Sequence, residues 1–191
     1  FKAAVDDLEK QGMKKLLVDL RNNPGGVLDT VVDMLDYILP DDLIIEGDKD
    51  LVRTNTEATL LVYMADKNGK GGQEYASDGH SLDIPLAVLV NGESASASEV
   101  FTGAMKDYGR ATVVGTKTFG KGIVQNLIPL DNGTAIKMTT AHYYTPSGFD
   151  LHGKGIEPDV EVELKEELKN QITVDVKEDN QIQAALKALD K

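Results

Sequence analysis

The sequence predicts an α/β fold with a mainly parallel sheet and an added antiparallel β-hairpin. Strand-like and helix-like segments alternate along the chain, which is typical of parallel strands joined by helical crossovers. The strand-like segments are short apolar runs such as 85–90, as expected for strands buried on both faces. The turn sequence Asp131-Asn132-Gly133 separates two longer strand-like segments and predicts the hairpin.

In the first 84 residues, apolar spacing predicts two helices with a buried strand between them. Gln11-Gly12 is a helix-ending signal, and Pro40 ends the second helix. The expected elements are a helix over 3–12, a strand over 15–20, a loop over 21–26 and a helix over 27–39. Shorter strand-like pieces between polar turns follow, so we interpret 41–84 as a strand-rich insertion.

The rest of the chain repeats the order of strand and helix. The expected elements are a strand over 85–90, a helix over 96–108, a strand over 111–114, hairpin strands over 123–130 and 135–144, and an amphipathic helix over 182–189. A length of 191 residues suits one domain. We therefore interpret 1–191 as a single domain, with 164–191 as a C-terminal extension.

Composition excludes several kinds of function. The 20 Lys+Arg and 32 Asp+Glu give a net charge of −12, which argues against a nucleic-acid partner. The absence of Cys excludes thiol nucleophiles, disulfides and Cys-based metal sites. No apolar run reaches the ~20 residues of a membrane helix. The chain opens at Phe1, without an initiator Met and inside a helical pattern, so we interpret it as a piece of a longer protein.

A phosphate-binding loop is the first candidate site. The sequence GTKTFGKG over 115–122 nearly matches G-x-x-x-x-G-K-[ST] and follows a strand. However, Gly122 replaces the hydroxyl residue that binds Mg²⁺, and a strand-like run follows where a phosphate loop needs a helix. We therefore expect a tight turn with an exposed Lys rather than a nucleotide site.

Two further loops lie between a strand and a helix, where α/β proteins place their active sites. One has the sequence NGESASASE over 91–99, in which Ser96 and Glu99 match an S-x-x-E capping box. Spacing alone does not choose among Ser94, Ser96 and Ser98 as a nucleophile. The other has the sequence DLRNNPGG over 19–26. The backbone amides of its two glycines could bind an anion, and the alternative is an ordinary turn without a ligand.

The three histidines have no partners at metal-ligand spacing. His80 lies in a polar loop, His142 in a strand, and His152 between Leu151 and Gly153. A structural role is the expectation for each, so the sequence predicts neither a metal site nor a cofactor.

Taken in order along the chain, these segments resemble one family. The sequences over 19–26, 90–99 and 115–125, together with GKGIEPD over 153–159, are similar to those of the C-terminal processing peptidases, also called tail-specific or carboxyl-terminal serine proteases of family S41. The resemblance extends from about residue 1 to 163. It implies a ClpP/crotonase-like core and a serine endopeptidase that cleaves proteins near their C-termini through an acyl-enzyme.

The resemblance also assigns residues. It places the nucleophile at Ser96, the general base at Lys121 and a lysine-orienting residue at Gln125. Some members carry an acidic residue where Asp107 lies. The resemblance also implies that the oxyanion donors are the amide of Ala97 and an amide of Gly25 or Gly26, with Gly25 favoured.

The chemistry of a Ser–Lys pair agrees with this assignment. A serine hydroxyl needs a base to take its proton as it attacks. Lysine acts as that base only when it is neutral, so its ordinary pKa of ~10.4 must fall, which burial without an acidic partner achieves. Phe119 would give Lys121 an apolar wall, and no Asp or Glu lies within five residues before Lys121 or nine after it.

The resemblance further implies partners and a location. Substrates would be proteins or peptides bound as extended strands, and the parent would carry a PDZ domain that this chain lacks. It suggests an extracytoplasmic protease (periplasmic, cell-envelope or secreted), and leaves open a membrane anchor in the parent and a homo-oligomer. The alternative is a catalytically inactive peptide-binding module on the same fold.

Overall fold

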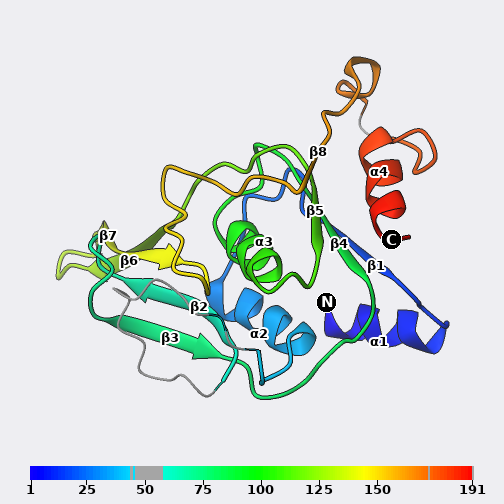
Figure 1. Cartoon of the computed structure of the whole chain (residues 1–191). Helices are drawn as coiled ribbons and strands as arrows, with labels where there is room; N and C mark the ends of the chain where they lie inside the picture. The colour runs from blue at the N-terminus through cyan, green and yellow to red at the C-terminus, as the bar shows by residue number, and fades with distance from the viewer. Residues whose placement is uncertain (44, 46–57, 172, 191) are drawn as a thin grey trace.

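The computed structural model describes residues 1–43, 45, 58–171 and 173–190 (Figure 1). Its helices are α1 (Lys2–Lys10), α2 (Leu28–Ile38), α3 (Ala97–Asp107) and α4 (Asn180–Ala188), with a 3₁₀ turn η1 (Glu166–Leu168). Its strands are β1 (Leu16–Asp19), β2 (Leu60–Ala65), β3 (Gly72–Ala76), β4 (Leu86–Val90), β5 (Thr112–Gly115), β6 (Ile123–Pro129), β7 (Ala135–Tyr144) and β8 (Val160–Glu161). The strands form one parallel and one antiparallel sheet.

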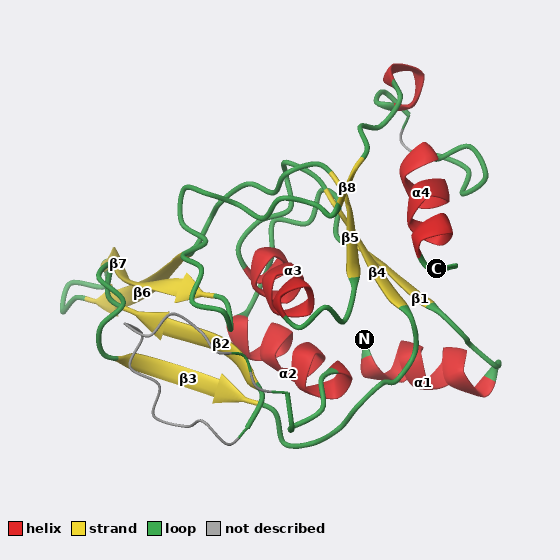
Figure 2. Cartoon of the chain, viewed as in Figure 1, coloured by secondary structure: helices red, strands yellow, loops and turns green. Residues whose placement is uncertain are grey.

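The parallel sheet has the order β1-β4-β5-β8 and is covered on both faces. Along β4, Val88 and Val90 belong to the main core with α2 and α3, whereas Ala87 and Leu89 pack with α4. This alternation follows from the two-residue period of a strand. Figure 2 shows α2 and α3 on one side of the sheet and α4 on the other. The continuous apolar run predicted a strand buried on both faces, and the structure confirms it.

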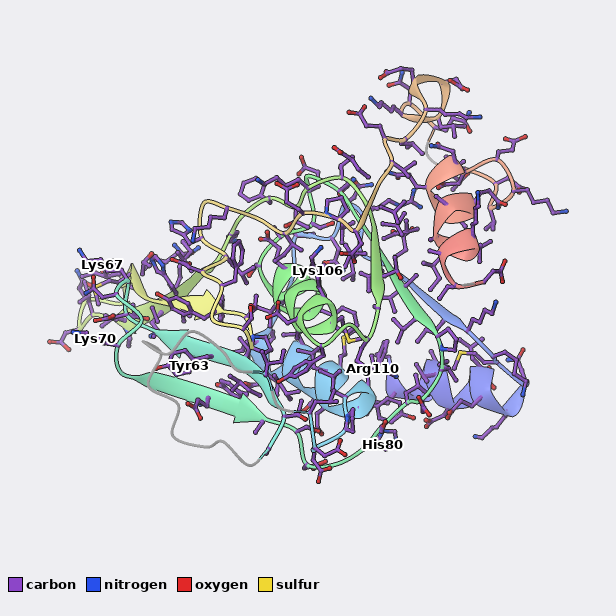
Figure 3. All side chains as sticks on the ribbon, viewed as in Figure 1. Tyr63, Lys67, Lys70, His80, Lys106 and Arg110 are labelled. Atoms are coloured by element: carbon purple, nitrogen blue, oxygen red, sulfur yellow. The ribbon has the colours of Figure 1, made fainter. Side chains whose placement is uncertain are left out.

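The antiparallel part is larger than the predicted hairpin. β6 and β7 pair as expected, but β2 also pairs with β7 and with β3, giving a four-stranded sheet of order β3-β2-β7-β6. Tyr63 of β2, labelled in Figure 3, packs against Tyr144 of β7 with 6.1 Å between ring centroids. The turn signals Asn68-Gly69 and Gly71-Gly72 predict the local β2–β3 hairpin, whereas the long-range β2–β7 pairing has no short sequence signal. The sheet is therefore a finding of the structure.

Most of the predicted elements are confirmed to within two residues. Three short elements, β3, β8 and η1, were not predicted as separate elements. The predicted insertion over 41–84 contains β2 and β3, and the part of it over 46–57 lies outside the described residues. In the described part of the chain, no helix is long and apolar enough to cross a membrane.

Candidate active site

Three loops meet where neighbouring parallel strands end. The glycine loop (20–27) follows β1, the serine loop (91–96) follows β4, and the lysine loop (116–122) follows β5. Because β1, β4 and β5 are adjacent and parallel, their carboxyl ends lie along one edge of the sheet. The structure thus brings together the loops that the sequence singled out separately.

Two of the three candidate serines have structural roles. Ser94 is fully buried, and its hydroxyl donates to the Leu20 carbonyl at 2.7 Å. The Ser98 hydroxyl donates to the Asn23 carbonyl at 3.1 Å. Both bonds fasten the serine loop and the start of α3 to the glycine loop.

Ser96 differs from its two neighbours. It is half-buried, precedes the first residue of α3, and has φ 57° and ψ −119°, a strained backbone conformation for a residue that is not glycine. Ser96 and Glu99 form the predicted capping box, in which the hydroxyl oxygen accepts. No described residue accepts the Ser96 hydroxyl proton, which leaves that proton available to a base.

Glu99 connects the serine loop to the lysine loop. Its side chain is fully buried, and one oxygen accepts from the Ser96 N–H at 3.0 Å and the Lys121 N–H at 2.7 Å. The other oxygen accepts from the Thr118 hydroxyl and the Gly120 N–H, both at 2.6 Å. Four donors therefore compensate one buried carboxylate. The sequence suggested only a helix cap here and missed this junction.

The side chains of the lysine loop remain outside the core. Lys121 and Gln125 are exposed, and Phe119 keeps 64% of its surface in contact with solvent. Among the described residues, no hydrogen bond or ion pair joins the Lys121 amine to the Ser96 hydroxyl. The apolar wall that the sequence led us to expect around Lys121 is thus not formed in this structure, although its backbone is fixed close to Ser96 through Glu99.

The glycine loop approaches Ser96 and its two neighbours closely. Gly25 has φ +92°, and a Cβ there would lie 2.5 Å from the Ala95 carbonyl oxygen and 2.7 Å from the Ala97 nitrogen. Gly26 has open space at the same point. The Gly25 N–H donates to the Asn23 side-chain oxygen at 2.9 Å, and the Ala97 N–H is one of the first amides of α3, which have no partner within a helix.

Asp107 lies away from the three loops. It is the last residue of α3, so ten helical steps of 1.5 Å place it about 15 Å from the end that carries Ser96. Its carboxylate accepts from the Ser147 N–H at 2.8 Å. The neighbouring Lys106 (Figure 3) pairs with Asp159 at 2.5 Å. The structure does not bring Asp107 together with Ser96 and Lys121.

A small apolar cavity of about 180 Å³ opens beside Gly25 and Ala97. Apolar side chains from the end of β1, from α2 and from α3 form most of its wall. They are Leu20, Val27, Val31, Met34 and Phe101, with Thr30 as a polar member. A cavity of this size and lining suits one aliphatic side chain.

The other candidates have structural surroundings. The loop over 115–122 leads into β6 and not into a helix, as expected for a turn. His80 contacts the Tyr37 carbonyl and stacks on the Tyr37 ring, and His142 pairs with Asp150 at 3.2 Å. The described residues contain no group of three or more His, Asp or Glu that could hold a metal ion.

Curated relatives share most of this chain. A probable CtpA-like serine protease of Staphylococcus epidermidis is 42% identical over 166 residues, which cover 85% of this chain and 30% of that protein. A protein of the same description from Staphylococcus aureus is 43% identical over 167 residues, with the same coverage. The chain thus spans about a third of the length of these relatives.

Solved structures agree with the fold. The photosystem II D1 C-terminal processing protease matches with a TM-score of 0.70 and 36% identity, over 84% of this chain and 38% of that one. A putative S41 protease of Bacteroides fragilis matches with a TM-score of 0.70 over 96% of this chain and 46% of that one, at 19% identity. The family model described as peptidase family S41 matches residues 1–162, and the chain therefore belongs to peptidase family S41.

Proposed function

We propose that this chain is the proteolytic core of a serine endopeptidase that cleaves proteins near their C-termini, with Ser96 as nucleophile and Lys121 as general base. The observation that carries the proposal is the Glu99 carboxylate, which holds the Ser96 and Lys121 amides at 3.0 and 2.7 Å. Ser96 is also the serine of its loop with a strained backbone and an unused hydroxyl proton.

Acylation would proceed as follows. The neutral Lys121 amine takes the Ser96 hydroxyl proton while Oγ bonds to the scissile carbonyl carbon. The carbonyl oxygen becomes an oxyanion, for which the Ala97 N–H and the N-terminal dipole of α3 are suitably placed. The Gly25 N–H would exchange the Asn23 oxygen for this oxyanion. The intermediate collapses as Lys121 returns the proton to the leaving amine. Water then attacks the acyl-enzyme ester while Lys121 takes a proton from the water, and Lys121 returns that proton to Ser96 Oγ as the ester bond breaks.

For this reaction, the Lys121 amine must approach the Ser96 hydroxyl and be shielded from solvent. The exposed lysine of this structure lacks the burial that favours a neutral amine. We propose that bound substrate, lying over the exposed Phe119 and Lys121, supplies that burial. Gln125, on β6 four residues further, would then orient the amine, as the family resemblance implies.

The apolar cavity predicts which substrate side chain the site prefers. A residue whose carbonyl sits between the Ser96 hydroxyl and the Gly25 and Ala97 amides would direct its side chain into the cavity. We therefore expect an aliphatic residue on the amino side of the cleaved bond. Peptides with Leu or Val there should be cleaved faster than peptides with Lys or Asp, because a buried unpaired charge is strongly unfavourable.

The central test uses the protein that carries this chain and an unfolded protein substrate. Ser96→Ala should abolish cleavage, and Lys121→Ala should lower it by at least about 100-fold near neutral pH. Ser81→Ala, at an exposed serine outside the three loops, is the matched control. Unchanged cleavage by Ser96→Ala would refute the proposal, as would a cleavage rate that does not rise as the pH is raised.

Several expectations about the whole protein remain predictions. They are the single domain over 1–191, the PDZ domain of the parent, a homo-oligomer and an extracytoplasmic location. Capture of a substrate C-terminus by strand addition would be measured as peptide binding to the parent but not to this chain. The comparisons do not favour the alternative of an inactive peptide-binding module.

A further inference from the structure

Helix α4 lies beyond residue 162, where the match to the family model ends, yet it is built into the parallel sheet. Its residues Ala185 and Leu189 are buried against Ala87, Leu89 and Val114 of β4 and β5. Without α4, this face of the two central strands would be exposed to water. The helix therefore completes the sheet whose edge carries the three loops.

The N-terminus of α4 is held by Arg21 of the glycine loop. One guanidinium nitrogen of Arg21 donates to the Asp179 carboxylate at 2.8 Å and to the Gln181 side-chain oxygen at 2.9 Å. The rest of the guanidinium bonds to Asp19 at the end of β1. The Arg21 and Asp179 side chains are only 13% and 3% exposed. Removing one partner of such a shielded, multiply bonded ion pair costs far more than breaking a surface pair, because the other charge stays buried and unpaired.

Asp179 has a second task at the same point. Its other oxygen caps α4 by accepting from the Gln181 and Ile182 amides at 2.9 and 3.0 Å. Burial by itself raises the pKa of Asp179, but the Ile182 amide and Arg21 outweigh it and hold that pKa below its ordinary value. Gln181 in turn donates to the Val162 carbonyl at 2.7 Å, which extends the connection to the end of β8.

The residues after Arg21 form the wall of the candidate active site. Asn22 and Asn91 exchange hydrogen bonds at 3.0 and 2.8 Å, which joins the glycine loop to the serine loop. The Asn23 carbonyl accepts from the Ala95 amide and the Ser98 hydroxyl, both at 3.1 Å. Its side chain holds the Gly25 amide. A shift of Arg21 would therefore be transmitted over four residues to Gly25.

We propose that α4 is a positioning element of the active site, in which Asp179 fixes Arg21 and thereby sets the position of the Gly25 amide beside Ser96. Asp179 and Gln181 touch no reacting atom and act through Arg21. The catalytic consequence rests on the proposed peptidase function, whereas the positioning of Gly25 can be measured without catalysis.

The test compares two Asp→Asn variants of α4 that each remove one ion pair. Asp179→Asn removes the charge that faces Arg21 but keeps a good helix-capping residue. Asp190→Asn removes the ion pair between Asp190 and Lys15. This pair is exposed and joins the chain just after α4 to the chain just before β1. Both variants are assayed well below their unfolding midpoints, so that each protein is folded.

Two measurements decide the outcome. The first is kcat and KM of the protein that carries this chain, on an unfolded protein substrate. The second is the amide ¹⁵N–¹H resonance of Gly25 in this 191-residue chain. We expect Asp179→Asn to lower kcat about tenfold, equivalent to about 1.4 kcal/mol, with little change in KM, and to move the Gly25 resonance. Asp190→Asn should do neither.

A merely structural role for α4 gives a different result. Asp179→Asn would then lower the unfolding midpoint but leave kcat and the Gly25 resonance as in the unchanged protein, and the proposal would be overturned. If the unchanged protein cleaves nothing, the proposed function fails, while a moved Gly25 resonance in Asp179→Asn still supports the positioning and an unmoved one refutes it.

Discussion

The serine loop and the lysine loop lie side by side but are built in different ways. In the serine loop, Ser94 is fully buried and the Ser96 backbone is held in a strained conformation. In the lysine loop, the backbone of Gly120 and Lys121 is locked by Glu99, while the side chains of Phe119 and Lys121 face solvent. The proposed nucleophile is thus preorganised, whereas the proposed base is not.

This difference separates structural from chemical importance. Changes at buried, multiply bonded positions affect folding and catalysis together. Changes at exposed side chains leave stability nearly unchanged, whatever their chemical role. Variants of the two loops can therefore show which residues support the site and which perform the reaction.

The largest effect is expected at the junction of the two loops. Glu99→Gln replaces one acceptor oxygen by an NH₂ group that faces N–H donors, and it removes the charge that four hydrogen bonds stabilise. We expect a loss of about 3–5 kcal/mol in the free energy of unfolding and a decrease of more than about 100-fold in cleavage. Urea unfolding and a proteolysis assay measure the two.

The matched control for Glu99 is Glu93→Gln. Glu93 lies in the serine loop but is exposed, so its free energy of unfolding should change by less than about 0.5 kcal/mol. Similar effects of the two substitutions would contradict the view that the Glu99 carboxylate joins the loops.

The next effect is expected in the glycine loop, and it tests how tightly the backbone around Ser96 is enclosed. Gly25→Ala would place a methyl group 2.5 Å from the Ala95 carbonyl oxygen, at a positive φ, and should lower the free energy of unfolding by about 2–3 kcal/mol. Gly26→Ala meets open space and should stay within about 0.5 kcal/mol of the unchanged chain. Thermal unfolding of the two variants measures this difference. Equal unfolding midpoints would contradict the close approach of Gly25 to the Ala95 carbonyl.

A smaller effect on stability is expected in the lysine loop. Lys121→Ala should change the free energy of unfolding by less than about 0.5 kcal/mol, because the side chain is exposed. Lys117→Ala, which removes an exposed pair with Glu157, should behave alike in unfolding. Only the first should stop cleavage. A large loss of stability in Lys121→Ala would show that this lysine has a structural role.

The smallest expected effect is the change in the stability contribution of Asp179 at low pH. Because the pKa of Asp179 is lower in the folded chain than its ordinary value of about 3.8, its contribution to stability is complete above that value and is lost as the pH falls through the lower folded value. The difference in the free energy of unfolding between the unchanged chain and Asp179→Asn should therefore shrink as the pH is lowered from about 5 to about 2. A constant difference across this range would mean that Asp179 does not titrate differently on folding.

The parallel half of the fold was predictable from the sequence because its strands and helices are local patterns. Apolar runs located β1, β4 and β5, and helical spacing located α2, α3 and α4. The four-stranded antiparallel sheet was not predictable, since β2 and β7 pair over about 80 residues. The polar β3 has no strand signal of its own.

The candidate site was predictable as a set of loops but not as an arrangement. The sequence left Ser94, Ser96 and Ser98 equivalent until the resemblance chose among them, because backbone strain and hydroxyl partners exist only in the folded chain. It also indicated that no acidic residue lies near Lys121 along the chain, whereas Glu99 reaches its amide from 22 positions away.

The reach of Glu99 has a consequence for the order in which the chain assembles. Its donors in the lysine loop lie 19 to 22 residues further along the chain, beyond α3 and β5. Until β5 pairs with β4, the Glu99 carboxylate lacks its donors from the lysine loop, so its burial is unfavourable. The strained backbone of Ser96 is then not stabilised by Glu99 either. The local structure that the proposed nucleophile needs therefore forms only after β5 is in place.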